Sequence, residues 1–488
     1  SLGYVKYAPA LDAITMLNTE GNPGLRKVWM FALANIGSPA SEPFLRVVVQ
    51  GANYNYEQTD ALGSYLLLLD NLLKGGNKQL VENITKQMLK QSNMPVHAKS
   101  AALKLYTQSA TEKNGIAEII KALDSNNKQY REAALLYSQD IKSGEMYNAL
   151  MKKASKEKRP EIKAEIVTAF GVRGDKDALP FILKSLTEEV KVNNSEVIAA
   201  SMLSAAKLDG GQSVNAIISK MLSTNNSNVT SAGKTALLTI NSPQLTAEVA
   251  KAIPQATATS KIAFLELLGK RTATDQADVV FANATTICEK DGVGYTANQM
   301  LKNVATAKDV DRISALLDKT DVKCTQSVSA FQDALYVAVK GVGNQDEQAK
   351  RISGLMNKSQ NKPVYYNVLA MVGGQDALEI VSGAFKTNSG NVKQVAFDAL
   401  TKWSDFSATE ELYQISKATG EYSDKALTAY VSKINRSGQP ADQRLLLLRR
   451  ALDIAKTNQQ KNEIIRQIGR TGTFLALITA GRYLDNVD

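Results

Sequence analysis

Apolar residues recur along the chain at the spacing expected of helices. Between Ile162 and Phe170 they follow one another at intervals of four, one and three, and between Leu179 and Leu186 at intervals of three, one and three. This period places apolar side chains on one face of a helix. No segment keeps up the alternation of polar and apolar residues that a strand requires. The pattern therefore predicts an all-α protein without a sheet.

A unit of one apolar helix, a short polar loop and a second apolar helix repeats through the chain. The second helix often opens with an apolar and a basic residue followed by small residues, as in the segments 129–136, 161–167 and 391–396. Second helices are expected to begin near residues 25, 58, 96, 128, 161, 195, 227, 258, 293, 326, 362, 391, 422 and 458. The thirteen steps from 25 to 458 average about 33 residues, which suits a two-helix solenoid unit.

Glycine stands where many of these second helices are expected to end. The positions are Gly37, Gly171, Gly210, Gly269, Gly341 and Gly373. Glycine accommodates the left-handed conformation that commonly follows the last turn of a helix. After one of these ends, Pro180 falls in the first turn of the next predicted helix, where a missing N–H is tolerated.

With this repeat, the chain resembles the HEAT-repeat (armadillo-like) family of α-solenoids over essentially its whole length. The resemblance is clearest in Pro160–Glu189 and Ile116–Gln139, and it is weaker at Ile198 and Thr230, where a basic residue would be typical. It implies an α-α superhelix of about fourteen antiparallel helix pairs, with the second helices on the concave side. It implies no particular chemistry, because one fold hosts unrelated functions.

We expect residues 1–488 to form a single continuous solenoid. Residues 1–23 are expected to be an N-terminal capping segment. Residues 474–488 are typical of a first helix and the start of the loop after it, without the second helix that would follow. A solenoid needs a polar cap at each end. We therefore expect this segment to be the unpaired first helix of a truncated repeat, with the parent protein continuing beyond it.

The charge of the chain is mildly basic and unevenly distributed. Its 58 basic and 48 acidic residues give a net charge of +10, and half of that excess lies in residues 433–488. A second basic cluster lies within residues 152–163. Solvated helix faces are the ordinary interpretation, and a surface for an anionic partner is the alternative. The candidates for such a surface are Lys152, Lys153, Lys156, Arg159, Arg444, Arg449, Arg450, Arg466 and Arg470.

Few residues suggest catalysis or metal binding. His97 is the only histidine, and it lies far along the chain from both cysteines, so zinc-ligand spacing is missing. Gly233, Lys234 and Thr235 match the end of a phosphate-binding loop, but Asn228 stands where that motif needs glycine, and the segment is helical in pattern. The carboxylates show no calcium-loop pattern. We expect no catalytic centre, no cofactor and no metal site.

The two cysteines, Cys288 and Cys324, are expected in the loops of successive repeats. Neighbouring helix pairs pack about 10 Å apart, whereas a disulfide needs Cα atoms within about 7 Å. The two cysteines lie at different distances before their second helices, and this offset could bring them close enough for a disulfide. We nevertheless favour two separate thiols. A disulfide would support an oxidising compartment.

The aromatic residues are mostly expected to pack. Tyr54 and Tyr56 lie in a predicted loop with asparagine neighbours, where they either stack on a sugar or pack over the first helices as part of an end cap; we favour the cap. Trp29 and Trp403 are expected at core positions of second helices.

A long solenoid surface without a catalytic constellation indicates a non-catalytic scaffold or protein-interaction module. The Lys- and Asn-rich style of the repeats is similar to regions that flank 3-keto-disaccharide hydrolase-type domains in large exported bacterial proteins. That likeness implies an accessory region linked to carbohydrate processing, periplasmic or at the cell surface rather than cytoplasmic. Its partner would be another protein or an attached downstream domain, or else a glycan.

The alternative is a nucleic-acid binder or DNA glycosylase-like HEAT protein that uses a basic concave groove; we consider nucleic acid the less favoured partner. Its support is the basic cluster around Arg449 and Arg450. No apolar run approaches the length of about 18 residues that a membrane span requires.

Overall fold

The computed structural model describes residues 6–92, 94–188, 191 and 194–483. Within these ranges the chain forms twenty-nine α-helices, α1 to α29, and seven short 3-10 helices, with no strand. The expected all-α class is therefore confirmed. The chain divides into two compact units, residues 1–245 and 246–488, which we describe one at a time. Helix α15 begins at the last residue of the first unit and is grouped with the second.

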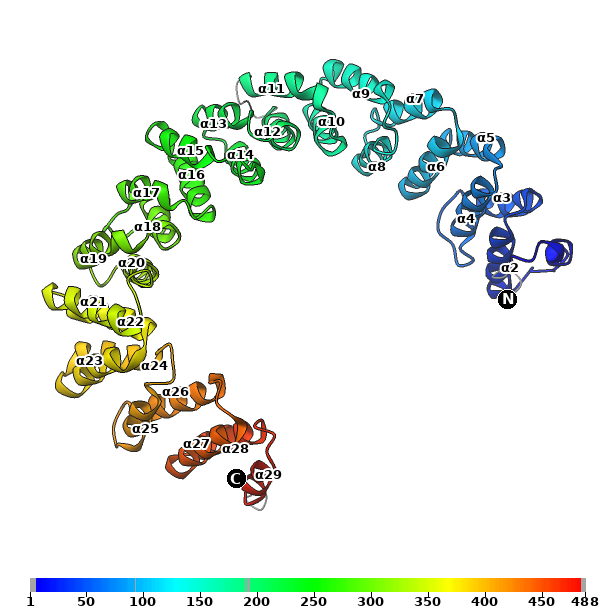
Figure 1. Ribbon diagram of the computed structural model, residues 1–488. Helices are drawn as coiled ribbons and strands as arrows, with labels where there is room; N and C mark the ends of the chain where they lie inside the picture. Colours follow the sequence, from blue (N-terminus) through cyan, green and yellow to red (C-terminus); the bar gives the residue numbers. More distant parts are fainter. Residues whose placement is uncertain (1–5, 93, 189–190, 192–193, 484–488) are drawn as a thin grey trace. The chain divides into compact units, whose positions relative to one another are not determined.

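Unit 1 contains seven helix pairs, in which odd-numbered helices form one row and even-numbered helices another (Figure 1). The pairs are α1 (Leu11–Thr15) and α2 (Pro23–Ile36), α3 (Glu42–Gly51) and α4 (Ala61–Lys74), α5 (Lys78–Leu89) and α6 (Val96–Ser109), α7 (Glu112–Ala122) and α8 (Lys128–Ser138), α9 (Gly144–Lys156) and α10 (Pro160–Arg173), α11 (Leu179–Thr187) and α12 (Ser195–Asp209), α13 (Val214–Leu222) and α14 (Ser227–Thr239).

Unit 2 contains seven further pairs and one last helix. They are α15 (Leu245–Ala252) and α16 (Ala258–Lys270), α17 (Ala277–Asn283) and α18 (Gly292–Val304), α19 (Val310–Lys319) and α20 (Thr325–Val339), α21 (Gln345–Lys358) and α22 (Tyr366–Val372), α23 (Gly374–Thr387) and α24 (Gly390–Thr401), α25 (Thr409–Lys417) and α26 (Ser423–Arg436), α27 (Ala441–Ile454) and α28 (Asn458–Gly469), then α29 (Phe474–Gly481). A 3-10 turn, η7 (Lys362–Tyr365), leads into α22.

The fourteen even-numbered helices are the second helices expected from the sequence. Each begins within four residues of its expected position, so the prediction of about fourteen antiparallel pairs is confirmed. The largest difference is at α22, where η7 occupies the expected start. The described part of the final segment, α29, is a first helix without a following partner among the described residues, and residues 484–488 lie outside the description.

Capping side chains explain where many of the helices begin. Asn127 and Thr257 accept hydrogen bonds from backbone N–H groups in the first turns of α8 and α16, and Thr457 does the same at α28. Such caps satisfy N–H groups that have no partner within the helix. At these helices the polar residue before the apolar run therefore sets the helix start.

Odd and even helices bury different amounts of their surface. The odd-numbered α19 buries one stripe, formed by Val310, Ile313, Ser314 and Leu317. The even-numbered α12 contacts α10, α11 and α14, and it buries residues on most of its surface. In unit 1 one continuous hydrophobic cluster extends from η1 (Ala8–Ala10) to α12. The apolar repeat thus produces a core shared by successive pairs.

Some of the glycines expected at helix ends lie instead inside helices, at positions where two helices pack closely. Gly37 follows its helix in the left-handed conformation, as expected. Gly171 and Gly269, however, lie inside α10 and α16, and Gly174 ends α10 instead. A Cβ built on Gly171 would lie 2.9 Å from the Cα of Ser204 in α12. The missing side chain therefore lets the two helices approach, which is a packing role rather than a capping role.

We expect Gly171→Ala to lower the free energy of unfolding by about 1–3 kcal/mol, because the added methyl group meets backbone that cannot move alone. The matched control is Gly354→Ala in α21, where no atom lies within 4 Å of the added Cβ. That change should instead raise stability by about 0.5–1 kcal/mol through helix propensity. Thermal unfolding followed by circular dichroism distinguishes the two. Equal shifts of the two variants would contradict the packing role.

Side chains also tie consecutive even helices of unit 1 together. Asn71 of α4 donates from Nδ2 to the carbonyl of Ala34 in α2 at 2.9 Å. Ser204 of α12 donates to the carbonyl of Val167 in α10 at 2.9 Å. Arg173 of α10 donates to the carbonyls of Ser138 and Ile141 at the end of α8. The carbonyls of Ala34 and Ser138 lie at the ends of α2 and α8, that of Ile141 lies in the loop after α8, and that of Val167 lies inside α10.

In unit 2 the structure joins Cys288 and Cys324 in a disulfide, with the Cα atoms 4.9 Å apart. Our preference for separate thiols is therefore wrong for this structure. The buried Asn298 of α18 explains the short separation, because its amide bonds both backbone groups of Thr285 and the hydroxyl of Ser327 in α20. These bonds bring the loop before α18 next to the start of α20.

Among the helices that the structure describes, none is long and apolar enough to cross a membrane.

Candidate functional site

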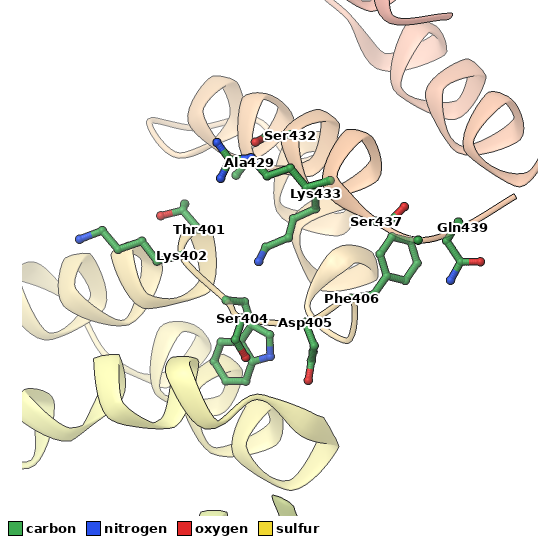
Figure 2. Close-up of a pocket in the computed structure, with 13 residues that line it drawn as sticks. Thr401, Lys402, Ser404, Asp405, Phe406, Ala429, Ser432, Lys433, Ser437 and Gln439 are labelled. Atoms are coloured by element: carbon green, nitrogen blue, oxygen red, sulfur yellow. The ribbon is translucent and has the colours of Figure 1, made fainter. Parts of the chain in front are cut away.

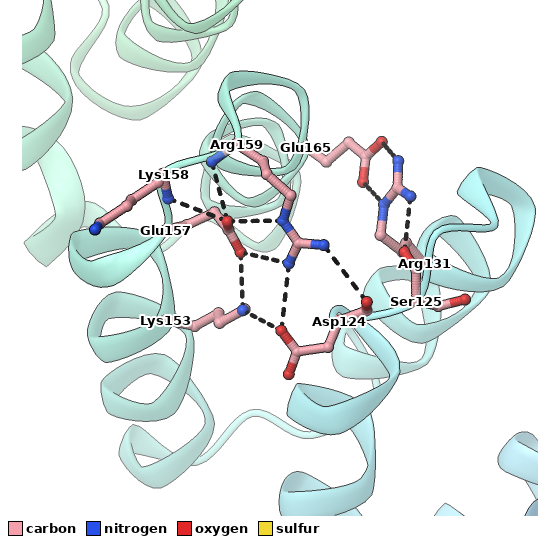
Figure 3. A network of polar contacts seen from close by, with 8 residues as sticks. All are labelled: Asp124, Ser125, Arg131, Lys153, Glu157, Lys158, Arg159 and Glu165. Atoms are coloured by element: carbon pink, nitrogen blue, oxygen red, sulfur yellow. Dashed lines mark hydrogen bonds and ion pairs between the residues drawn. The ribbon is translucent and has the colours of Figure 1, made fainter.

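Two of the four candidates in the basic cluster of residues 152–163 are paired with carboxylates of neighbouring segments (Figure 3). Lys153 Nζ lies 2.6 Å from Asp124 Oδ1 and 2.8 Å from Glu157 Oε2, and Arg159 Nε lies 2.9 Å from Glu157 Oε1. The hydrogen bond from Arg159, supported by the one from Lys153, holds the pKa of Glu157 well below its ordinary value. The remaining members of the cluster are exposed on α9: Lys152 and Lys156.

Beside this network lies a second, more deeply buried ion pair (Figure 3). Arg131 of α8 donates from Nε and Nη2 to the two oxygens of Glu165 in α10, at 2.8 and 2.7 Å. Its Nη1 donates to the carbonyl of Ser125 at 2.9 Å. This basic residue of the repeat motif therefore joins two successive even helices and faces no solvent groove.

The candidates in the C-terminal basic cluster, residues 433–488, are distributed over α27, α28 and the position just after α28. Arg450 of α27 bonds Glu410 at 3.0 and 3.1 Å and lies over the ring of Tyr413, with 4.0 Å between the guanidinium carbon and the ring centre. The other cluster members on α27 are half-buried: Arg444 and Arg449.

Two predicted residues do line a cavity. Arg466 of α28 and Arg470 just after it border a groove of about 1260 Å³ between α26 and α28. Lys425 and Arg436 of α26 line the same groove, against the carboxylates of Asp424 and Glu463. Arg466 is ion-paired with Glu463. The groove thus has four cationic and two anionic side chains, with polar amides and hydroxyls around them.

A separate pocket of about 570 Å³ lies between the α24–α25 loop and the C-terminal half of α26 (Figure 2). Lys433 extends from α26 toward the loop residues Ser404 and Asp405. The sequence analysis did not single out Lys433 or Arg436, which lines the pocket too. Both belong to the C-terminal excess of basic residues. Their spacing of three residues on a predicted second helix places them on the same helix face, and this was the sequence signal that could have indicated a shared site.

Asp405, the only carboxylate among the pocket-lining residues, serves the fold. Its oxygens accept hydrogen bonds from the backbone N–H of Gly374 at 2.7 Å, from Gln345 Nε2 at 3.0 Å, and from the N–H and hydroxyl of Ser407 at 2.9 and 2.5 Å. Burial alone would raise the pKa of Asp405, but these hydrogen bonds outweigh it and lower that pKa. Asp405 therefore connects three successive repeats, and both of its carboxylate oxygens already accept hydrogen bonds from the protein.

The other motifs also have structural explanations. Gly233 lies inside α14, where a Cβ would approach Met221 to 2.6 Å, so Gly233–Thr235 is not a phosphate loop. His97 is exposed in the first turn of α6. Among the described residues, no group of three or more His, Cys, Asp or Glu side chains is arranged to hold a metal ion.

The aromatic residues fall partly as expected. Tyr54 is buried, but Tyr56 is 77% exposed, so only the first packs as a cap residue would. Trp29 is nearly buried in α2 and donates to the carbonyl of Ile14 at 2.7 Å. Trp403 is buried too, but it lies in the loop after α24 rather than within the helix, which corrects the prediction.

Comparison of the chain with protein-family models and with curated proteins gives no match.

Proposed function

We propose that this chain is a non-catalytic binding scaffold, an α-solenoid that holds an acidic segment of a protein partner in the groove between α26 and α28. The observation that carries the proposal is the charge of that groove, where Lys425, Arg436, Arg466 and Arg470 outnumber two carboxylates. A positive groove attracts acidic partners and rejects basic ones. Its volume, about 1260 Å³, is large for a single small ligand.

The non-catalytic part of the proposal rests on how the candidate reactive groups are used. The carboxylates of Asp405 and Glu157 are occupied by hydrogen bonds and ion pairs that stabilise the fold. His97, exposed on α6, has no hydrogen bond or ion pair with any other described residue. A general base needs both a free acceptor atom and a site for the substrate beside it.

In its finer form, the proposal is that this HEAT-like solenoid is the accessory region of a larger exported bacterial protein linked to carbohydrate processing. The Cys288–Cys324 disulfide supports this form, because disulfides persist mainly in oxidising compartments. The partner in this case is an attached domain or a second protein of the same compartment.

A nucleic-acid-binding function is the weaker alternative. Arg450, one of the two residues that suggested it, is already paired with Glu410 and stacked on Tyr413. A glycosylase also needs a carboxylate free to act beside an aromatic residue. Asp405, which lines a pocket with Trp403 and Phe406, has both oxygens occupied.

The test is the binding of a fluorescein-labelled decaglutamate peptide to the full chain, followed by anisotropy at low and moderate salt. We expect saturable binding that weakens as salt rises. The double variant Arg466→Gln/Arg470→Gln should weaken it by at least about tenfold, the usual effect of losing charged hydrogen bonds. The control Lys350→Gln/Lys358→Gln removes the same charge from exposed positions of α21.

The control variant should bind the peptide as the unmodified chain does. Equal weakening of both double variants would mean that the peptide senses only the net charge, and the groove would be rejected. Tighter binding of a labelled DNA duplex than of the peptide, with a steep salt dependence, would favour the nucleic-acid alternative.

A further inference from the structure

The pocket between the α24–α25 loop and α26 is lined by three cationic residues, of which Lys402 is exposed in the loop and Lys433 and Arg436 lie on α26; none of the three has a carboxylate partner among the described residues. Lys433 is half-buried, and it makes no hydrogen bond or ion pair with any described residue. Arg436, one turn further along α26, is also unpaired among those residues. The single lining carboxylate, Asp405, has four donors on its two oxygens already. The pocket therefore has unused positive charge.

Leaving Lys433 unpaired is costly to the fold. Burial lowers the pKa of Lys433, Arg436 lowers it further, and Asp405 only partly opposes them. Other cations of unit 2 do have carboxylate partners, as Arg450 does in Glu410 and Arg351 in Asp311. A half-buried charged group that lies in a pocket without a partner is a candidate for a binding residue.

The remaining lining groups suit a polar ligand larger than a bare ion. Ser432 and Gln439 supply hydroxyl and amide groups that both donate and accept hydrogen bonds, and the hydroxyl of Ser437, which donates to the carbonyl of Ile434 at 2.6 Å, can still accept one. Phe406, on the side of the pocket near Ser437 and Gln439, supplies an aromatic surface (Figure 2). A volume of about 570 Å³ lies within the range of small-molecule sites.

We propose that this pocket binds a sugar-sized anion that carries a carboxylate or phosphoryl group, with Lys433 and Arg436 bonding the charged oxygens. Both groups present oxygens that ammonium and guanidinium donors recognise by charge-assisted hydrogen bonds. The hydroxyl and amide groups hold the rest of the ligand. The pocket is distinct from the α26–α28 groove, although Ser432 and Arg436 line both.

The experiment titrates the full chain with glucuronate, glucose 6-phosphate and glucose by isothermal calorimetry. We expect at least one of the two anions to bind with a dissociation constant of about a millimolar or less, and the neutral sugar to bind at least about tenfold more weakly. Lys433→Gln should weaken anion binding by at least about tenfold. Lys350→Gln removes an exposed lysine of α21 that lines neither the pocket nor the groove, and it should leave anion binding unchanged.

Folding of the variant is checked by its thermal unfolding. Because Lys433→Gln removes a half-buried unpaired charge, its midpoint should equal or exceed that of the unmodified chain. A variant that unfolds is replaced by Arg436→Gln, which changes an exposed side chain. Binding of neither anion, equal binding of glucose, or anion binding unchanged by Lys433→Gln would overturn the proposal. The decaglutamate assay with the Arg466→Gln/Arg470→Gln variant tests the groove separately, so the two proposals fail independently.

Discussion

Glu165→Gln is expected to lower the free energy of unfolding by about 3–5 kcal/mol, because it leaves the guanidinium of Arg131 without its counterion. The Arg131 side chain is only 6% exposed and that of Glu165 14%. Water therefore cannot replace the lost partner. Chemical denaturation followed by circular dichroism measures the change, and hydrogen exchange at α8 and α10 locates it.

Two further variants make this expectation specific. Arg131→Met/Glu165→Leu removes both charges and should recover most of the loss, since a buried ion pair is often no more stabilising than apolar residues of similar volume. Asp311→Asn breaks a similar arginine–carboxylate pair whose members are 37% and 71% exposed, Arg351 and Asp311, and it should cost under about 1 kcal/mol. A loss as large at the exposed pair would show that burial does not set the cost.

Removal of the disulfide is expected to lower stability by a similar amount. The bond joins residues 36 positions apart in the chain, and closing a loop of that length in the unfolded state is worth about 4 kcal/mol on the chain-entropy estimate. Cys288→Ser/Cys324→Ser and the unmodified chain in reductant should therefore unfold at similar, lower denaturant concentrations.

Reductant should not change the unfolding of the double serine variant, which controls for other effects of the reagent. Thiol titration of the denatured, non-reduced chain should find no free thiol. Two free thiols would mean that the bond does not form in the protein. The export form of the proposed function would then lose its support.

The repeat could be predicted because residues close together in the sequence determine where each of these helices begins. Caps such as Asn127 and Thr257, together with the apolar period, determine helix starts without reference to distant residues. The start of α4 was less well placed, at 58 rather than 61. Glu57 there bonds the N–H groups of Thr59 and Ala61, and so holds the chain in a loop before the helix.

The fate of the charged residues was not predictable in the same way. Lys153 finds Asp124 at a separation of 29 residues, and Arg450 finds Glu410 at 40. These partners lie about one repeat away, where small differences in loop length decide whether two side chains meet. Counting charge along the sequence therefore marked residues that the fold neutralises.

The pocket was hidden for a related reason. It combines the loop that follows α24 with one face of α26. Lys433 can be recognised as an unpaired cation only when the hydrogen bonds that occupy Asp405 are known. From the sequence, Lys433 and Asp405 could form an ion pair. Nothing in the local sequence indicates that Ser407, Gly374 and Gln345 donate hydrogen bonds to both oxygens of Asp405.

The ties between even helices in unit 1 bear on how the chain folds as it leaves the ribosome. Asn71, Arg173 and Ser204 each satisfy a carbonyl 32 to 37 residues earlier in the chain. The carbonyls of Ala34, Ile141 and Val167 therefore gain these bonds only after the helix that carries the donor has emerged. At about 5–20 residues per second that delay is about 2–7 s. At these three positions, the contacts between successive even helices are completed only when both helices have been synthesised.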